Sequence, residues 1–283
     1  MPTEHDPQIE TLAVHAGERR PGPDGSVVFP IYQSTVFTVE PGTGYHDISY
    51  IRLSSTPSQT YLHDKLATLE GAQAAVATCS GMAAVTAALH TLLRAGDHLL
   101  AGDCLYGGTH DFLTHHAHDL GWSYTFLDSS RPETWEAART PRTRAILVET
   151  ITNPLMRVGR LRELVAFARH HELVTVIDNT FATPVNLRPV SIGFDLCFNS
   201  ATKYLTGHSD INMGYVAARD TVTPCFRMRR AKSSLPAGSS DLIGGGAGLA
   251  HDTTSNATAT RTSAAARSFA RATTEASAAP PPN

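Results

Sequence analysis

The sequence predicts an α/β fold built on a mostly parallel, doubly wound sheet. From about residue 60 to 220, short apolar runs alternate with amphipathic stretches, which is the pattern of successive β-α units. The spacing of the apolar runs leaves room for a helix between most of them. Because such crossovers are right-handed, we expect helices on both faces of the sheet.

The individual elements follow from hydrophobic periodicity. Three helices are predicted at residues 61–69, 82–93 and 161–171, where apolar residues recur about every three and four positions. Six strands are predicted from short apolar runs, at residues 98–101, 123–127, 145–149, 174–178, 196–199 and 215–217.

Composition divides the chain into three regions. Residues 1–58 are interrupted by Pro, Gly, Ser and Thr, and are expected to form an extended arm without a core of its own. Residues 59–230 form the predicted domain. Residues 231–283 are dominated by Ala, Ser, Thr, Gly and Pro, which favours a disordered tail. The alternative, a structured tail, would rest on the short Ala-rich stretch 264–272.

Charge and cysteine content narrow the class of function. The formal net charge is −3, so the chain lacks the excess of basic residues typical of proteins that bind nucleic acids or membrane surfaces. A small molecule is the expected partner. The N-terminus lacks a signal-peptide pattern, and no apolar run reaches the ~20 residues of a membrane span. A cytoplasmic protein is therefore predicted. Its four cysteines are widely spaced and expected to be reduced: Cys79, Cys104, Cys197 and Cys225.

Polar residues that follow apolar runs are the first candidates for a site, because ligands of open parallel sheets collect at the carboxyl ends of the strands. At Ser80-Gly81-Met82 a loop enters a helix, so the first backbone N–H groups could bind a phosphate. A plain N-cap at Ser80 explains the same tripeptide.

Asp178 and Lys203 follow two further apolar runs. A carboxylate at position 178 needs a cationic partner, such as a pyridinium nitrogen, although capping of the following turn is an equal alternative. Lys203 lies in a small polar loop with the hydroxyls of Ser200 and Thr202, which suits an amine that forms a Schiff base. The alternative is a solvated surface lysine.

Taken together, the motifs from about residue 10 to 217 resemble the Cys/Met-metabolism family of pyridoxal-phosphate enzymes. That family includes cystathionine γ-synthase, cystathionine β- and γ-lyases, methionine γ-lyase and O-acetylhomoserine sulfhydrylase. The matching segments are His15-Ala16-Gly17, Pro30-Ile31-Tyr32-Gln33, Leu69-Glu70-Gly71, Tyr106-Gly107-Gly108-Thr109, Asn153-Pro154, Asp178-Asn179-Thr180-Phe181, Ser200-Ala201-Thr202-Lys203-Tyr204 and Gly207-His208-Ser209-Asp210.

The resemblance implies the large domain of the fold type I pyridoxal-phosphate enzymes and assigns a role to each matching residue. Lys203 would bond the cofactor, Asp178 would pair with its ring nitrogen, and Tyr106 would stack on the ring. The phosphate would be held by the backbone at Gly81 and Met82 and by the hydroxyls of Ser200 and Thr202. Asn153 is also assigned to cofactor binding.

Tyr50 and Arg52 match a family pair that reaches into the phosphate site of a neighbouring subunit, which implies a homodimer or homotetramer. The alternative is a solvated arginine on a loose arm. The family's smaller C-terminal domain is not recognisable after about Gly214, so no residue is assigned to the substrate carboxylate.

The implied activity is that of a pyridoxal-phosphate lyase or transferase acting at Cβ or Cγ of sulfur-containing or O-acylated amino acids. Two alternatives are an inactive family remnant that still binds the cofactor or a partner subunit, and an aminotransferase, which shares the lysine and aspartate. No metal site is predicted. His110, His115, His116 and His118 are expected on a solvated helix face, and Cys104 as a small buried side chain rather than a nucleophile.

Overall fold

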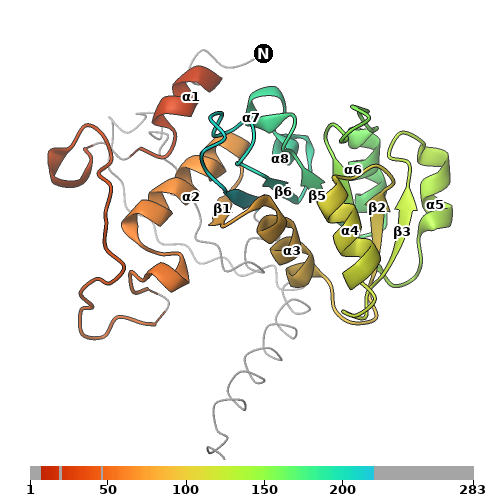
Figure 1. Ribbon diagram of the computed structural model, residues 1–283, viewed down its shortest axis with the longest axis horizontal. Helices are drawn as coiled ribbons and strands as arrows, with labels where there is room; N and C mark the ends of the chain where they lie inside the picture. Colours follow the sequence, from red (N-terminus) through yellow and green to blue (C-terminus); the bar gives the residue numbers. More distant parts are fainter. Residues whose placement is uncertain (1–7, 19–20, 46, 220–283) are drawn as a thin grey trace, which may run out of the picture. The chain divides into compact units, whose positions relative to one another are not determined.

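The structure, a computed structural model, describes residues 8–18, 21–45 and 47–219 (Figure 1). All of these belong to one of the two units into which the chain divides, residues 1–236. The predicted tail, residues 231–283, and the last part of the predicted domain, residues 220–230, lie outside the described residues.

A seven-stranded sheet with the order β1-β7-β6-β5-β4-β2-β3 forms the centre of the described chain. Strands β2 to β6 pair in parallel, whereas β7 runs antiparallel to both of its neighbours, β6 and β1. The mostly parallel sheet confirms the predicted fold class. The strands are β1 (Ala74–Thr78), β2 (His98–Gly102), β3 (Ser123–Leu127), β4 (Thr143–Glu149), β5 (Val174–Asp178), β6 (Leu196–Asn199) and β7 (Gly214–Ala218).

Helices pack on both faces of this sheet, because successive strand residues point to opposite sides. Leu99 and Ala101 of β2 join the hydrophobic cluster that contains the buried residues of α3 and α4, whereas Leu100 joins the cluster of α5, α6 and α8. The helices are α1 (Ile9–His15), α2 (Pro57–Glu70), α3 (Gly81–Leu92), α4 (Gly107–His116), α5 (Trp135–Ala138), α6 (Leu161–His170), α7 (Thr183–Asn186) and α8 (Pro189–Ile192).

All six predicted strands and all three predicted helices are present, and β3, β5 and β6 have the predicted bounds. Strand β1 was not predicted. Its sequence, AAVAT, is short and rich in alanine, which has little preference for strands. Helix α4 contains His110, His115 and His116, all exposed, as expected for a solvated helix face, whereas His118 lies in the turn that follows it.

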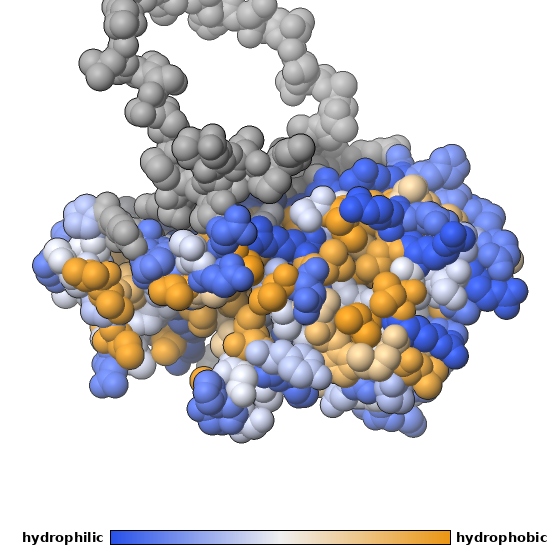
Figure 2. Space-filling model, turned by 90° about the horizontal axis from the view of Figure 1, so that it is seen from above, coloured by the Kyte–Doolittle hydropathy of each residue, from blue (hydrophilic) through white to orange (hydrophobic). Residues whose placement is uncertain are grey.

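Residues 21–56 contain little regular structure: two short 3₁₀ turns, Pro23–Gly25 and Ile51–Leu53, and a bridge between Val36 and Tyr50. The segment touches α2, where the ring of Phe29 stacks on Tyr61 at 4.1 Å between centroids. Figure 1 draws this segment on the left, and Figure 2 shows hydrophobic residues on the left of the molecule. The exposed large hydrophobic residues of the segment are Val27, Val28, Ile31, Val36, Val39, Tyr45 and Ile51.

Three parallel strands end at the edge of the sheet where the site lies. Glu149 ends β4, Asp178 ends β5, and Asn199 ends β6, and the register places Glu149 directly opposite Asp178. The loops that follow these strands therefore meet at one edge. Helix α3 begins at the same edge, with Ser80 as its N-cap.

Candidate active site

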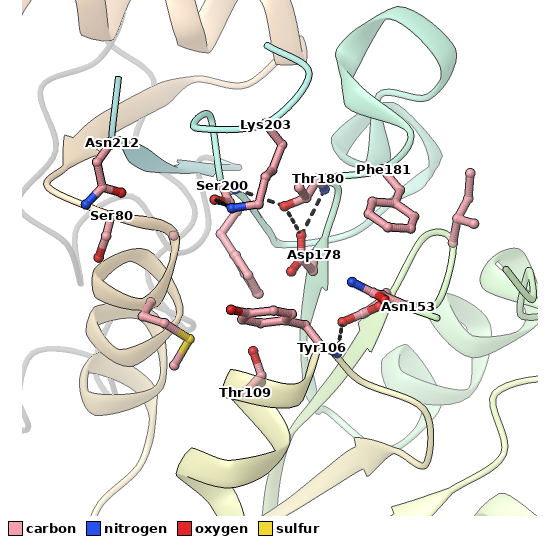
Figure 3. Close-up of a pocket in the computed structure, with 15 residues that line it drawn as sticks. Ser80, Tyr106, Thr109, Asn153, Asp178, Thr180, Phe181, Ser200, Lys203 and Asn212 are labelled. Atoms are coloured by element: carbon pink, nitrogen blue, oxygen red, sulfur yellow. Dashed lines mark hydrogen bonds between the residues drawn. The ribbon is translucent and has the colours of Figure 1, made fainter. Parts of the chain in front are cut away.

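A cavity of about 180 Å³ opens at the carboxyl ends of β4, β5 and β6, beside the first turns of α3 and α4. Figure 3 shows Lys203, Asp178 and Tyr106 directed toward it from three different elements. Seven of the ten residues predicted for the site line this cavity: Gly81, Met82, Tyr106, Asn153, Asp178, Ser200 and Lys203.

Asp178 presents a carboxylate to the cavity from the end of β5. Its Oδ1 accepts hydrogen bonds from the backbone N–H of Thr180 at 2.8 Å and from the Thr180 hydroxyl at 2.5 Å. Within the described residues, no hydrogen bond reaches Oδ2. Burial raises the pKa of Asp178 to about 6, although the Thr180 hydrogen bonds and the charge of Lys203 act in the opposite direction. A cation facing Oδ2 would stabilise the ionised form.

Lys203 lies in a turn after β6, where its backbone N–H bonds to the Ser200 carbonyl at 3.1 Å. Its Nζ is 3.5 Å from the hydroxyl oxygen of Ser200, and its charge acts on Asp178. The residue as a whole is exposed, but its side chain lines the cavity (Figure 3). The amine is therefore close to the carboxylate and open to a ligand.

The first turn of α3 provides backbone donors beside Lys203. The Ser80 hydroxyl accepts from the N–H of Ala83 at 3.0 Å, whereas the earlier N–H groups of a helix have no intrahelical acceptor. At Gly81, a Cβ atom would lie 2.5 Å from the Ser200 Cβ, so only glycine allows this close approach. The N–H groups of Gly81 and Met82, the helix dipole and the Ser200 hydroxyl suit an anion such as a phosphate.

Glu149 connects two loops on the other side of the cavity. Its Oε1 accepts from the backbone N–H of Tyr106 at 2.5 Å, and its Oε2 accepts from the backbone N–H of Asn153 at 3.0 Å. Burial, and then the charge of Asp178, raise the pKa of Glu149 to about 7, against the effect of these two hydrogen bonds.

Three predicted residues are not among those that line the cavity. The Thr202 hydroxyl accepts from the backbone N–H of Met213 at 2.9 Å and lies 3.0 Å from the Met213 carbonyl oxygen. Arg52 lies in the 3₁₀ turn Ile51–Leu53, whose N-cap is Tyr50, and the Arg52 guanidinium stacks over the Tyr50 ring at 4.6 Å. Their assignment to a neighbouring subunit stays a prediction.

Sequence reasoning overlooked Glu149, although it had the signal that identified Asp178: an acidic residue at the end of an apolar strand. Other lining residues lie in motifs that were noted without a role for these positions. They are Ser80, Thr109, Thr180 and Phe181, and the remaining ones, Ile151, Phe198 and Asn212, carried no motif.

Among residues 8–18, 21–45 and 47–219, no three or more His, Cys, Asp or Glu side chains are grouped so that they could hold a metal ion. No helix in that same part of the chain combines the length and the apolar character needed to cross a membrane. The three cysteines it contains, Cys79, Cys104 and Cys197, are free thiols.

The fold and the cavity together define an α/β protein with an amine, a carboxylate and a helix N-terminus at the ends of parallel strands. The sequence model of the family described as Cys/Met metabolism PLP-dependent enzymes matches residues 10–240 of this chain. The chain belongs to this family.

Similar proteins carry several activities of the family. The chain is 39% identical over 206 residues to a probable cystathionine gamma-synthase of Herpetosiphon aurantiacus, and 38% identical over 233 residues to the L-methionine gamma-lyase of Pseudomonas putida. These matches cover 73% and 80% of this chain but 64% and 58% of the relatives. The chain therefore spans less than two thirds of the length of these curated relatives.

A solved structure is also similar, the cystathionine gamma-lyase from Lactobacillus plantarum in complex with L-serine. The TM-score is 0.72 at 32% sequence identity, and the likeness covers 78% of this chain and 57% of that one. The fold is therefore that of a fold type I pyridoxal-phosphate enzyme.

The residues of the cavity fit pyridoxal phosphate, the cofactor of this family. The cofactor has an aldehyde, a basic ring nitrogen and a phosphate, and the cavity offers an amine, a carboxylate with an unused oxygen and the N-terminus of a helix of 12 residues. Each group of the ligand has a chemical counterpart among the residues that line the cavity.

Proposed function

We propose that this protein is a pyridoxal-phosphate-dependent carbon-sulfur lyase, or a transferase resembling cystathionine γ-synthase, in transsulfuration and methionine metabolism. It would act at Cβ or Cγ of sulfur-containing or O-acylated amino acids. The observation that carries the proposal is one cavity containing the Lys203 amine, the Asp178 carboxylate and the first turn of α3.

We assign the cofactor to these residues by their chemistry. Lys203 supplies the amine that bonds the aldehyde, and Asp178 holds a proton on the ring nitrogen. The backbone at Gly81 and Met82 and the Ser200 hydroxyl bind the phosphate. Tyr106, at the start of α4, would stack on the ring, and Asn153, in the loop after β4, would also take part in cofactor binding. Tyr50 and Arg52 would complete the phosphate site of a neighbouring subunit.

When bound, the cofactor withdraws electrons from the substrate Cα, which makes the Cα proton acidic. The Lys203 Nζ is the group of this chain suited to accept that proton, acting as a general base. The Tyr106 hydroxyl is suited to move a proton near the leaving group. A cation facing Asp178 would favour its ionised form, since burial raises the pKa of this carboxyl to about 6.

A homodimer or homotetramer follows from the proposed role of the arm. The hydrophobic side chains exposed along residues 27–39 support such contacts, because exposed apolar patches often mark protein interfaces. The cytoplasmic location stays a prediction from the sequence.

The proposal is tested by adding pyridoxal phosphate to the purified full chain and recording visible absorption, followed by assays of keto-acid release from cystathionine, homocysteine and O-acetylhomoserine. We expect a coloured protein that releases a keto acid from at least one of the three. A protein that remains colourless would contradict the cofactor assignment. A coloured protein inert toward all three would contradict the activity and support the inactive remnant.

A further inference from the structure

Glu149 is a buried carboxylate whose two oxygens bond to two different loops. Tyr106 belongs to the loop between β2 and α4, whereas Asn153 belongs to the loop that follows β4 itself. Glu149 is only 5% exposed, so these two hydrogen bonds are formed away from bulk water. One side chain thus joins segments that are 47 residues apart in the sequence, Tyr106 and Asn153.

Only a carboxylate can make this pair of bonds. Both partners are backbone N–H donors, so each oxygen must accept. A glutamine of the same shape has one acceptor oxygen, and its NH₂ group would face the second N–H donor. The neighbouring Asp178 makes a charge at this position unfavourable, because the register places the two acids opposite each other. The hydrogen bonds accepted by both oxygens of Glu149 offset the electrostatic repulsion from Asp178.

The bond to Tyr106 acts on the placement of its ring. Tyr106 is the N-cap of α4, and no side-chain hydrogen bond caps the helix at this residue. The ring packs so closely over Gly108 that a Cβ there would lie 2.7 Å from the Tyr106 Cε1. The Tyr106 carbonyl accepts from the N–H groups of Thr109 and His110, and its own N–H donates to Glu149, so Glu149 holds the backbone from which the ring projects.

We propose that Glu149 is a positioning residue that clamps Tyr106 and Asn153 at a fixed separation and so preforms one wall of the cavity for an aromatic ligand. The identity of that ligand as pyridoxal phosphate rests on the proposed function. The clamp itself is a property of the chain alone. Asp178 from β5 is the ionisable group nearest in register, and Lys203 from the turn after β6 acts on Asp178.

Hydrogen exchange of the cofactor-free protein tests the clamp directly, because the two amides are protected only while Glu149 accepts from them. We expect E149Q to speed exchange about tenfold at pH 8 in peptides that cover residues 103–110 and 150–157. Peptides from α6 should be unchanged. The matched control is E133Q, which removes an exposed carboxylate paired with Arg131.

The pH dependence of the exchange rates distinguishes a hydrogen-bonding role of Glu149 from a general packing role. Below about pH 7 the wild-type carboxyl itself takes up a proton. The ratio of the exchange rates of E149Q and wild type should therefore fall toward one between pH 8 and pH 5.5. E149D, which keeps two acceptor oxygens, should restore part of the protection. An unchanged rate in E149Q, a ratio independent of pH, or an E149D no better than E149Q would each overturn the proposal.

If E149Q does not fold, hydrogen exchange of the wild-type protein at different pH values tests the clamp. Protection at both loops must then fall on acidification from pH 8 to 6 while α6 stays protected, and constant protection would overturn the clamp. Titration with pyridoxal phosphate adds the ligand readout: E149Q should bind it about tenfold more weakly than E133Q. If the wild-type protein binds no pyridoxal phosphate, the proposed function is wrong. The exchange rates still test the clamp, because they are measured without the cofactor.

Discussion

At the scale of the residue, the site depends on two acidic side chains held opposite each other at the ends of β4 and β5. Burial raises the pKa of Asp178 to about 6 and that of Glu149 to about 7. Glu149 has two N–H partners, whereas Asp178 bonds only through Oδ1 within the described residues. The unsatisfied charge at Asp178 is therefore available to a cationic ligand.

Replacing Asp178 by asparagine should change how stability depends on pH. The folded pKa of Asp178 lies above its ordinary value of 3.8, so the folded state binds more protons than the unfolded state between about pH 4 and 6. Wild-type stability should lose up to about 3 kcal/mol from this group as the pH rises through that window. D178N should lack this loss, as measured by urea unfolding of the cofactor-free protein at pH 4.5 and 7.

An exposed aspartate provides the control for that comparison. Asp119 has a side chain that is 79% exposed, and D119N should keep the wild-type slope. If D178N and wild type lose the same free energy of unfolding between the two pH values, the raised pKa of Asp178 is wrong.

At the scale of the element, the proposed phosphate site depends on how β7 packs against the start of α3. A Cβ at Gly214, the first residue of β7, would lie 2.3 Å from the Ser80 carbonyl oxygen. This neighbour is backbone at the N-cap of α3, so it cannot rotate away. The antiparallel strand β7 therefore places the amides of Gly81 and Met82.

G214A should displace the first turn of α3 and weaken binding of the phosphate. We expect pyridoxal phosphate to bind at least about tenfold more weakly, since several charge-assisted hydrogen bonds depend on this turn. Pyridoxal, which lacks the phosphate, should be affected much less. Both affinities are measured by absorbance titration.

G102A is the matched substitution, because Gly102 also lies in a strand and the nearest atom to its Cβ would be at 3.6 Å, an ordinary contact. It should bind both ligands like wild type. An equal loss of pyridoxal and pyridoxal phosphate in G214A would show that the turn does not bind the phosphate.

Sequence patterns predicted those elements whose residues carry the signal themselves. The runs SYTFL and VTVID have β-branched or aromatic residues and became β3 and β5 with the predicted bounds. Strand β1 was overlooked because AAVAT is held in the sheet by its pairing with β7, a contact of distant segments that no local pattern encodes. Of the site, the residues of short motifs were predicted, but the link from Glu149 to Tyr106 depends on tertiary packing.

At the scale of the whole molecule, the described residues contain a seven-stranded sheet and an arm with exposed apolar side chains. It spans 64% of one curated relative and 58% of another. The residues that line the cavity, to which we assign the cofactor, lie within residues 80–212, whereas no residue is assigned to the substrate carboxylate. Cofactor binding is therefore the property that the described residues support most directly.

The most direct test of this account is borohydride reduction of the protein with pyridoxal phosphate, followed by proteolysis and mass mapping of the labelled peptide. The chain has three lysines, Lys65, Lys203 and Lys232, so the result is unambiguous. We expect a stable cofactor label on Lys203 and none in K203A. A label on Lys65 or Lys232 instead, or an unlabelled wild-type protein, would contradict it.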